Sequence, residues 1–537
     1  MAKRLKIILY VFLFLQYPHV FATKYWISFS DKSGVEFDPY TYFSKRTIDQ
    51  RSAQGLDLCD PRDFPVSEKY CFALLPFCDS VSFSSRWLNG IAIYSSAERI
   101  NKIRNLSFVS SILEMNSHSI LAYKENDFCD LNKYNSAILH YQTDRLGGKE
   151  FKAKNIDGKG IRIAVLDAGF KGVDKNSAFN KLRNEKRIIA TYDFVRKNEN
   201  VYVSHWHGTA ALSCIVGELD SVKIGLATGA EILLARTERV SMETMSEEEN
   251  WLAAAEWADK NGANIISSSL GYTYNRYFNN EMDGRSSLIA MGATIAAAKG
   301  ILVVNAAGNE AKDNWHYIDT PADADSVLAV GGTDPETDIH IYFSSFGPTS
   351  DGRLKPNVSA PGHVTAAGVI GMKEMFGTSF STPLVAGFAA CAWQMDRSLS
   401  NMQLFHEIEK SGHLYPYFDY AHGYGIPQAK HFLDTTRTIE PTFDFVIVND
   451  QIKVVLREKY SYADQEIALG YKAQRNLYYK VQSKNGVIKS YTVFLAGTKE
   501  MLNLQAEDFT EGDEITVHFE GYTSILDFPK IESEDIK

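Results

Sequence analysis

The sequence predicts an α/β fold: a doubly wound, mostly parallel sheet, preceded by an α+β domain and followed by a β-sandwich. With 537 residues, the chain is long enough for two to four domains. Between residues 136 and 436, short apolar strands alternate with helices, which is typical of a parallel sheet covered on both faces. From Thr442 onward, two-residue turns separate the strands, which is typical of antiparallel hairpins.

The first 22 residues have the composition of a signal peptide. Lys3, Arg4 and Lys6 precede an unbroken apolar run of nine residues, and Val20-Phe21-Ala22 follows as a cleavage-like site. Nine apolar residues are too few to cross a bilayer, which needs about 20. We therefore expect residues 1–22 to be removed on export, no membrane span, and a protein that is secreted or held in the cell envelope.

Residues 23–115 are predicted to form a small mixed domain. Lys24–Phe29 alternates like a strand, and Trp87–Ile112 has the pattern strand, helix, strand. Ser95 and Glu98 are predicted to form a capping box at the start of that helix. Residues 116–135 lack a strong pattern, and we interpret them as a linker and processing region.

The central domain, residues 136–436, contains four strongly patterned strands. They are Ile161–Asp167, Ala230–Arg236, Asn264–Gly271 and Ile301–Gly308. Between them, one helix is predicted to start at a Ser246/Glu249 capping box and to stop at Gly262, and another to run through Ala290–Ala298. The last domain, residues 442–537, contains the predicted hairpins Phe443–Leu456 and Tyr478–Phe494. It carries no cluster of residues typical of catalysis, and its role could be binding at an exposed sheet edge or structural capping, of which we favour capping.

Charge and cysteine content exclude some classes of function. The net charge of −10 and the absence of a Lys/Arg block argue against nucleic-acid binding. Export would allow disulfides among Cys59, Cys71, Cys78 and Cys129, but their pairing cannot be derived from the sequence. The last two cysteines, Cys214 and Cys391, lie in apolar helical stretches and are predicted to be core residues.

Four polar residues lie where predicted strands end or helices begin. Asp167 ends a strand, Asn309 follows another, and His207 and Ser379 each open a helix. Ligands and catalytic groups gather at such positions in α/β sheets. A serine needs a base to accept its proton, histidine can act as that base, and a carboxylate can orient the imidazole. An asparagine amide and the Ser379 N–H could bind the oxyanion.

The segments around these residues resemble the sequence blocks of subtilisin-like serine proteases. The segments "AVLDAGF", "HGTAALSCIVG", "AAGNE" and "FGTSFSTPLVAG" occur in that family's order, and the likeness covers about 300 central residues. The resemblance implies that Asp167 orients, His207 is the base, Ser379 attacks, and Asn309 with Ser379 forms the oxyanion hole. Ala168 departs from the family, which often has threonine or serine after the aspartate.

The resemblance also implies where substrate and inhibitor bind. "SSSLG" is similar to the family's substrate-binding strand, so Ser269, Leu270 and Gly271 are candidate substrate-binding residues, and alignment places Asp319 near the base of the S1 pocket. Residues 23–115 resemble the family's inhibitor propeptides, which implies a self-processed precursor. The expected partners are therefore protein or peptide substrates and the chain's own propeptide.

The chemistry requires no cofactor. Structural calcium is common in this family, and Asp323, Asp325 and Asp334 could supply oxygen ligands, although their spacing forms no defined calcium loop.

Other interpretations of the same residues stay open. Ser379 could be only a helix N-cap, and Asp319 a solvated loop acid or one bound to backbone amides. The whole chain could be a non-catalytic binding or scaffold protein that keeps the protease fold. His205 and His207 could instead be metal ligands of a metal-dependent hydrolase, although no third ligand lies nearby in the sequence.

Overall fold

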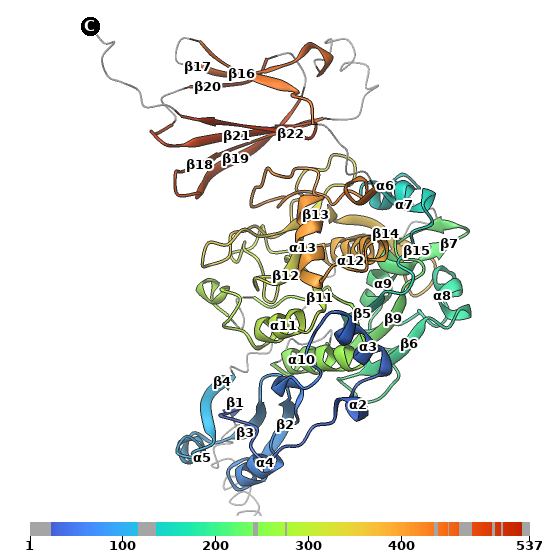
Figure 1. The fold of residues 1–537 in the computed structure, drawn as a ribbon, viewed down its shortest axis with the longest axis vertical. Coiled ribbons are helices and arrows are strands. Elements are labelled where there is room, and N and C mark those ends of the chain that lie inside the picture. Colours follow the sequence, from blue (N-terminus) through green and yellow to red (C-terminus); the bar gives the residue numbers. More distant parts are fainter. Residues whose placement is uncertain are drawn as a thin grey trace, which may run out of the picture.

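The computed structural model describes residues 23–115, 136–239, 245–273, 277–433, 439–448, 451–460, 475–496, 500–505 and 509–528. The predicted signal peptide (1–22) and linker (116–135) lie outside these residues. An N-terminal domain, a central domain and a C-terminal β domain follow one another along the long axis of the molecule (Figure 1). Within the described ranges, no helix is both long enough and apolar enough to cross a membrane.

The N-terminal domain is built on a four-stranded antiparallel sheet, in the order β2-β3-β1-β4. It confirms the predicted strand at Lys24–Phe29 and the strand-helix-strand pattern at Trp87–Ile112. The capping residue of α5 is Ser96, whose side chain accepts from the Arg99 N–H, and not the predicted Ser95. The Ser95 hydroxyl instead donates to the Phe77 carbonyl. The elements of this domain are β1 (Thr23–Phe29), α2 (Pro39–Tyr42), α3 (Lys45–Ala53), α4 (Glu68–Leu74), β2 (Ser80–Ser85), β3 (Gly90–Ser95), α5 (Ala97–Ile103) and β4 (Val109–Met115).

The central domain is a seven-stranded parallel sheet in the order β13-β12-β11-β10-β5-β9-β6. Its strands are β5 (Arg162–Asp167), β6 (Ile188–Asp193), β9 (Glu231–Arg236), β10 (Ile265–Ser268), β11 (Leu302–Ala306), β12 (Val327–Thr333) and β13 (Val358–Pro361). Two hairpins accompany it, formed by β7 (Glu218–Leu219) with β8 (Val222–Lys223) and by β14 (His363–Ala367) with β15 (Met372–Phe376). The four strands predicted for this domain are confirmed.

Helices cover both faces of this sheet, because alternate strand residues point to opposite sides. They are α6 (Ser136–Asp144), α7 (Gly148–Ala153), α8 (Asn180–Asn184), α9 (His207–Val216), α10 (Met245–Lys260), α11 (Leu288–Ala298), α12 (Thr378–Met395), α13 (Asn401–Lys410) and α14 (Lys430–Leu433). Ile163 and Val165 of β5 pack in one buried cluster with α9 and α12, whereas Ala164 and Leu166 pack in another with α10 and α11.

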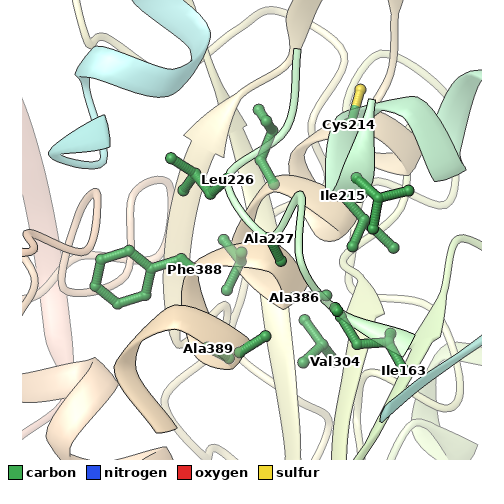
Figure 2. Close-up of a cluster of buried hydrophobic side chains, with 14 of the residues drawn as sticks. Ile163, Cys214, Ile215, Leu226, Ala227, Val304, Ala386, Phe388 and Ala389 are labelled. Carbon is green, nitrogen blue, oxygen red and sulfur yellow. The ribbon is translucent and has the colours of Figure 1, made fainter. Parts of the chain in front are cut away.

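The core on the α9 and α12 side contains the two cysteines predicted there. Figure 2 shows Cys214 and Ile215 of α9 near Ile163 and Val304 of the sheet and Ala386 of α12. Cys214 and Cys391 are both fully buried, and burial raises the pKa of the Cys214 thiol to about 12. Their prediction as core residues is confirmed. Of the four cysteines considered for disulfides, Cys59, Cys71 and Cys78 are free thiols, and Cys129 lies outside the described residues.

The C-terminal domain consists of two antiparallel sheets, ordered β16-β17-β20 and β19-β18-β21-β22, around their own core. The two predicted hairpins are confirmed: β16 pairs with β17, and β18 pairs with β19. The strands are β16 (Phe443–Val448), β17 (Gln451–Leu456), β18 (Asn476–Gln482), β19 (Ile488–Leu495), β20 (Glu500–Gln505), β21 (Glu514–Phe519) and β22 (Tyr522–Asp527). This domain lies at the opposite end of the central domain from the N-terminal sheet (Figure 1).

The N-terminal domain is held to α10 by buried polar contacts. Lys24 pairs with Glu249 at 2.7 Å, and both side chains are at most 5% exposed. Glu256 accepts from the Ser85 hydroxyl and from the Trp87 N–H. The predicted Ser246/Glu249 capping box is therefore wrong, because α10 already begins at Met245 and the Glu249 carboxylate binds Lys24.

A second buried contact joins α3 to the central domain. Arg51 pairs with Asp63 and with Asp259 of α10, each at 2.6 Å, and Lys299 pairs with Asp63 at 2.7 Å. All four side chains are at most 5% exposed. Burial raises the pKa of Asp259 to about 6 although the positive charges of Arg51 and Lys299 oppose that shift. Arg51 therefore provides positive charge that stabilises the ionised form of these buried carboxyl groups.

We predict that Arg51→Ala lowers the free energy of unfolding by about 3 kcal/mol, because it leaves buried carboxylates without their main cation. Denaturant unfolding of the full chain measures this. Arg99→Ala is the matched control, since Arg99 pairs with Asp79 where both side chains are at least 30% exposed. Equal effects of the two substitutions would contradict the importance of the buried pair.

Candidate active site

The candidate residues lie at the carboxyl ends of neighbouring parallel strands. Asp167 is the last residue of β5, Ser269–Gly271 follows β10, and Asn309 follows β11. Because β5, β10 and β11 are adjacent in the sheet, these three segments meet at one edge. Helices α9 and α12 start at His207 and Thr378, and they pack against each other on one face of the sheet.

Asp167 and His207 form a hydrogen-bonded pair. The His207 Nδ1 lies 2.9 and 3.0 Å from the two carboxylate oxygens of Asp167. Asp167 is fully buried, and it also accepts from the Ala168 N–H. Gly208 allows this approach, because a Cβ there would lie 2.9 Å from the Asp167 Cβ and 2.6 Å from the Gly169 carbonyl. Nδ1–H therefore faces the acid, which leaves Nε2 as the unprotonated, basic nitrogen of the neutral ring.

The pKa of His207 is raised. Burial of the ring alone would lower it, but the negative charge and hydrogen bond of Asp167 outweigh that effect. A base with a raised pKa holds a transferred proton more firmly, and the buried acid stabilises the resulting imidazolium.

His205, which was also considered as a metal ligand, contacts the backbone of His207. Its Nδ1 accepts from the His207 backbone N–H at 3.2 Å, at the first residue of α9. Burial and the neighbouring His207 lower the pKa of His205 to about 4, so the ring is neutral near pH 7. Over the described part of the chain, no group of three His, Cys, Asp or Glu side chains could hold a metal ion.

The three acids considered for calcium each have protein partners. Asp323 accepts from the Gly284 N–H, and Asp334 accepts from the backbone of Glu336 and Thr337. Asp325 is 92% exposed and lies 4.0 Å from Arg353. Calcium binding at these acids stays a prediction.

Ser379 is half-buried in the first turn of α12. Its hydroxyl donates to the Ser269 carbonyl at 3.3 Å, and the Ser269 hydroxyl donates to the Ser379 carbonyl at 2.7 Å. No hydrogen bond joins Ser379 to His207 among the residues that the structure describes. The next residue, Phe380, has its ring centroid 5.4 Å from that of His207. His207 thus lies beside the start of α12, and catalysis would require the hydroxyl to turn from Ser269 to the imidazole.

Asn309 is held against the residue that precedes Ser379. Its Oδ1 accepts from the Thr378 N–H at 2.9 Å and from the Thr378 hydroxyl at 3.0 Å. This orientation leaves the Asn309 amide N–H groups available to an oxyanion, beside the Ser379 N–H at the helix N-terminus. Sequence reasoning missed Thr378 as the residue that orients Asn309, although it lies in the same "GTS" segment as the serine.

Asp319 lies between two segments of the site and is only 3% exposed. A Cβ on Gly271 would be 2.5 Å from Asp319 Oδ2, and one on Gly308 would be 2.7 Å from Asp319 Cγ. Asp319 therefore lies between the segments that follow β10 and β11 and is buried rather than solvated, whereas its place at the base of the S1 pocket stays a prediction.

Glu310 is a second acid beside Asp319 that sequence reasoning missed. Burial raises the pKa of Glu310 despite its hydrogen bonds with Asp319, the Asn309 N–H and Ser345. The signal available in the sequence was its position directly after Asn309 in "AAGNE".

We predict that Asp167→Asn lowers the pKa of His207, because it removes the negative charge that raises it while burial persists. Histidine-resolved NMR titration of the Ser379→Ala chain measures the change without self-digestion. His413 is the internal reference, since burial and the neighbouring His422 lower the pKa of His413. An unchanged His207 pKa would contradict the assigned pairing.

Comparison with known proteins agrees with this geometry. Residues 158–425 match the model of the subtilase family, and residues 24–127 match that of the peptidase S8 propeptide domain, Bacteroidota. A thermostable alkaline protease of Halalkalibacterium halodurans is 28% identical over 265 residues, which are 48% of this chain and 63% of the relative. Alkaline elastase YaB of Bacillus sp. is 28% identical over 265 residues, again 48% of this chain but 61% of the relative. The serine protease AprX of Bacillus subtilis is 26% identical over 355 residues, 58% of this chain and 75% of the relative.

A solved protein structure is also similar to part of this chain. A cold adapted subtilisin-like serine proteinase is 24% identical and covers 48% of this chain and 84% of its own, with a TM-score of 0.39. This chain spans less than two thirds of the length of the first two relatives named above. The propeptide match precedes the subtilase match along the chain, and the described geometry lies within the subtilase match. The chain therefore belongs to the subtilase family and carries a peptidase S8 propeptide domain ahead of its subtilase domain.

Proposed function

We propose that this protein is an exported serine endopeptidase, made as a precursor that processes itself. The observation that carries the proposal is the Asp167–His207 hydrogen bond beside the start of α12, where Ser379 lies. Family membership supports it, since the relatives named above are proteases.

In the proposed reaction, Ser379 Oγ attacks the carbonyl carbon of the scissile peptide while His207 Nε2 takes the hydroxyl proton. The carbonyl oxygen becomes an oxyanion that the Asn309 amide and the Ser379 N–H stabilise. His207 then gives the proton to the leaving amine, the C–N bond breaks, and an acyl-enzyme remains. Water then attacks the acyl carbon while His207 takes its proton, the bond between that carbon and Ser379 Oγ breaks, and His207 returns the proton to Oγ as the acid product leaves. No cofactor takes part in these steps.

The N-terminal domain would inhibit the enzyme until it is cut off. Its buried contacts with α10 and Lys299 support tight docking in the precursor. The proposed cut lies in residues 116–135, between this domain and the subtilase domain. Export rests on the signal-peptide pattern of residues 1–22.

We predict that Ser379→Ala lowers turnover roughly 10⁶-fold and leaves the precursor uncut. Asn309→Asp keeps an acceptor for Thr378 but loses the amide donor, so it should lower turnover by about 10²–10³-fold. Peptide hydrolysis and intact mass measure both effects. Normal maturation of the purified Ser379→Ala chain would refute self-processing.

A phosphonate probe separates this proposal from a non-catalytic binding protein with the same fold. A serine protease is labelled at Ser379, and labelling is lost in Asp167→Asn if the triad activates that serine. A binding protein is not labelled there. A metal-dependent hydrolase would in addition lose its activity to a chelator.

The position of Asp319 supports a preference for a cationic side chain at P1. Asp319, which is buried, and Glu310, which is half-buried, form an acidic pair where the segments that follow β10 and β11 meet. In such a water-poor site, a lysine or arginine would gain a charge-assisted hydrogen bond to the pair.

We therefore predict that wild-type enzyme prefers Lys or Arg at P1 and that Asp319→Asn reduces this preference by about 10-fold. A peptide library with varied P1 measures the ratio of kcat/KM values. Asp325→Asn is the control, because Asp325 is 92% exposed. A wild-type profile without preference for cationic P1 residues would remove this part of the proposal.

A further inference from the structure

The C-terminal β domain is joined to the candidate oxyanion site by a continuous series of rings. Phe346 stacks between two imidazoles, with centroid distances of 4.7 Å to His316 and 4.3 Å to His340. His340 lies 6.1 Å from His422, and His422 lies 5.3 Å edge-on to Tyr478 of β18. We call these five residues the ring column. Four belong to the central domain and one, Tyr478, to the C-terminal domain.

One end of the ring column holds the loop that carries Asn309, residues 308–311. The His316 N–H donates to the Glu310 carbonyl at 3.1 Å, and His316 Nδ1 donates to the Ala311 carbonyl at 2.8 Å. The Phe346 N–H donates in turn to the His316 carbonyl. Movement of either ring would therefore move the backbone on which Asn309 is mounted.

The residue before Phe346 holds the same loop from the other side. The Ser345 N–H donates to the Gly308 carbonyl at 3.0 Å, and the Ser345 hydroxyl accepts from the Glu310 N–H at 3.1 Å. The loop is therefore attached at Gly308, Glu310 and Ala311 to residues of the ring column or their immediate neighbour.

The other end of the ring column is buried under the C-terminal domain. Tyr478 is 3% exposed, and it also contacts Tyr417, His413 and His518 at centroid distances of 5.9 to 6.3 Å. Aromatic contacts of this kind depend on ring geometry and are lost when the ring is replaced by an aliphatic side chain.

Hydrogen bonds fix the rings between these two ends. His422 Nε2 accepts from the His340 N–H at 2.9 Å, and His422 Nδ1 donates to Asp419 at 3.0 Å. His340 Nε2 donates to the Ser344 carbonyl at 2.8 Å. Burial lowers the pKa of His340 to about 4, so that ring is neutral at the pH where a histidine base works. These hydrogen bonds fix the orientations of the His340 and His422 rings.

We propose that the C-terminal domain positions the oxyanion-binding loop through the ring column, and that Tyr478 is the positioning residue it supplies. This rests on the proposed function, because it takes the loop that holds Asn309 to bind the oxyanion. Tyr478 touches no reacting atom; it acts through His422, His340 and Phe346. The domain is then part of the working enzyme, in addition to covering one end of the subtilase domain.

The decisive comparison uses the full chain with Tyr478→Leu, Tyr478→Phe and Tyr491→Leu. Leucine removes the ring and keeps apolar volume, whereas phenylalanine keeps the ring. Tyr491 of β19 is the matched control, because its ring contacts Tyr420 of the same central domain, at a centroid distance of 6.4 Å, outside the ring column. Each variant is assayed with a peptide aldehyde, whose adduct with Ser379 places an oxyanion in the hole, and with the corresponding peptide alcohol, which forms no adduct.

We expect Tyr478→Leu to weaken aldehyde binding and to lower kcat by about 10-fold, with alcohol binding and KM unchanged. Tyr478→Phe and Tyr491→Leu should behave like wild type. Unchanged aldehyde binding in Tyr478→Leu would overturn the proposal, and so would an equal loss in Tyr491→Leu, which would mean that domain docking alone matters. If Tyr478→Leu does not fold, Phe346→Leu breaks the ring column within the central domain and should give the same loss; wild-type behaviour of that variant overturns the proposal.

A measurement that needs no activity separates this inference from the proposed function. In the Ser379→Ala background, amide hydrogen exchange of residues 308–316 should be faster with Tyr478→Leu than with Tyr478→Phe. Equal exchange overturns the ring column's role. Absence of hydrolysis and of an aldehyde adduct in the wild-type chain would instead refute the protease assignment.

Discussion

The common edge at which the parallel strands end is the constraint on which this site depends. Parallel neighbours β5, β10 and β11 must finish on the same side, so Asp167, the segment after Ser268 and the loop of Asn309 meet without any local attraction between them. The sheet can hold that edge rigidly because both of its faces are buried under helices. The sheet therefore holds the charged and polar groups of the site in fixed positions, which limits the reorganisation that catalysis would require.

The two outer domains contact the central domain in chemically different ways. The N-terminal domain docks through buried ion pairs and hydrogen bonds on α10, which are strongly directional and costly to break singly. The C-terminal domain docks through aromatic and imidazole rings around Tyr478.

The sequence predicted elements better than it predicted their ends. Ser95 and Ser246 both fitted a capping box, yet Ser96 caps α5 and Glu249 binds Lys24 across a domain boundary. A capping box is a local pattern, and a partner more than two hundred residues away is invisible to it. The same limit applies to Thr378 and Glu310, which lie in the quoted motifs but acquire their roles only from the loops that pack on them.

Taken alone, the sequence determined the strand and helix order, the buried cysteines and the residue types of the candidate site, because these follow from periodicity and from motifs in a fixed order. Only the tertiary structure decided that His207 Nδ1 faces Asp167, that Asn309 is oriented by Thr378, and that the Ser379 hydroxyl is turned toward Ser269. It alone also revealed the ring column and the buried charges around Arg51. The physical reason is that periodicity reports which face of an element is buried, whereas hydrogen bonds and ring contacts depend on which distant segment arrives at that face.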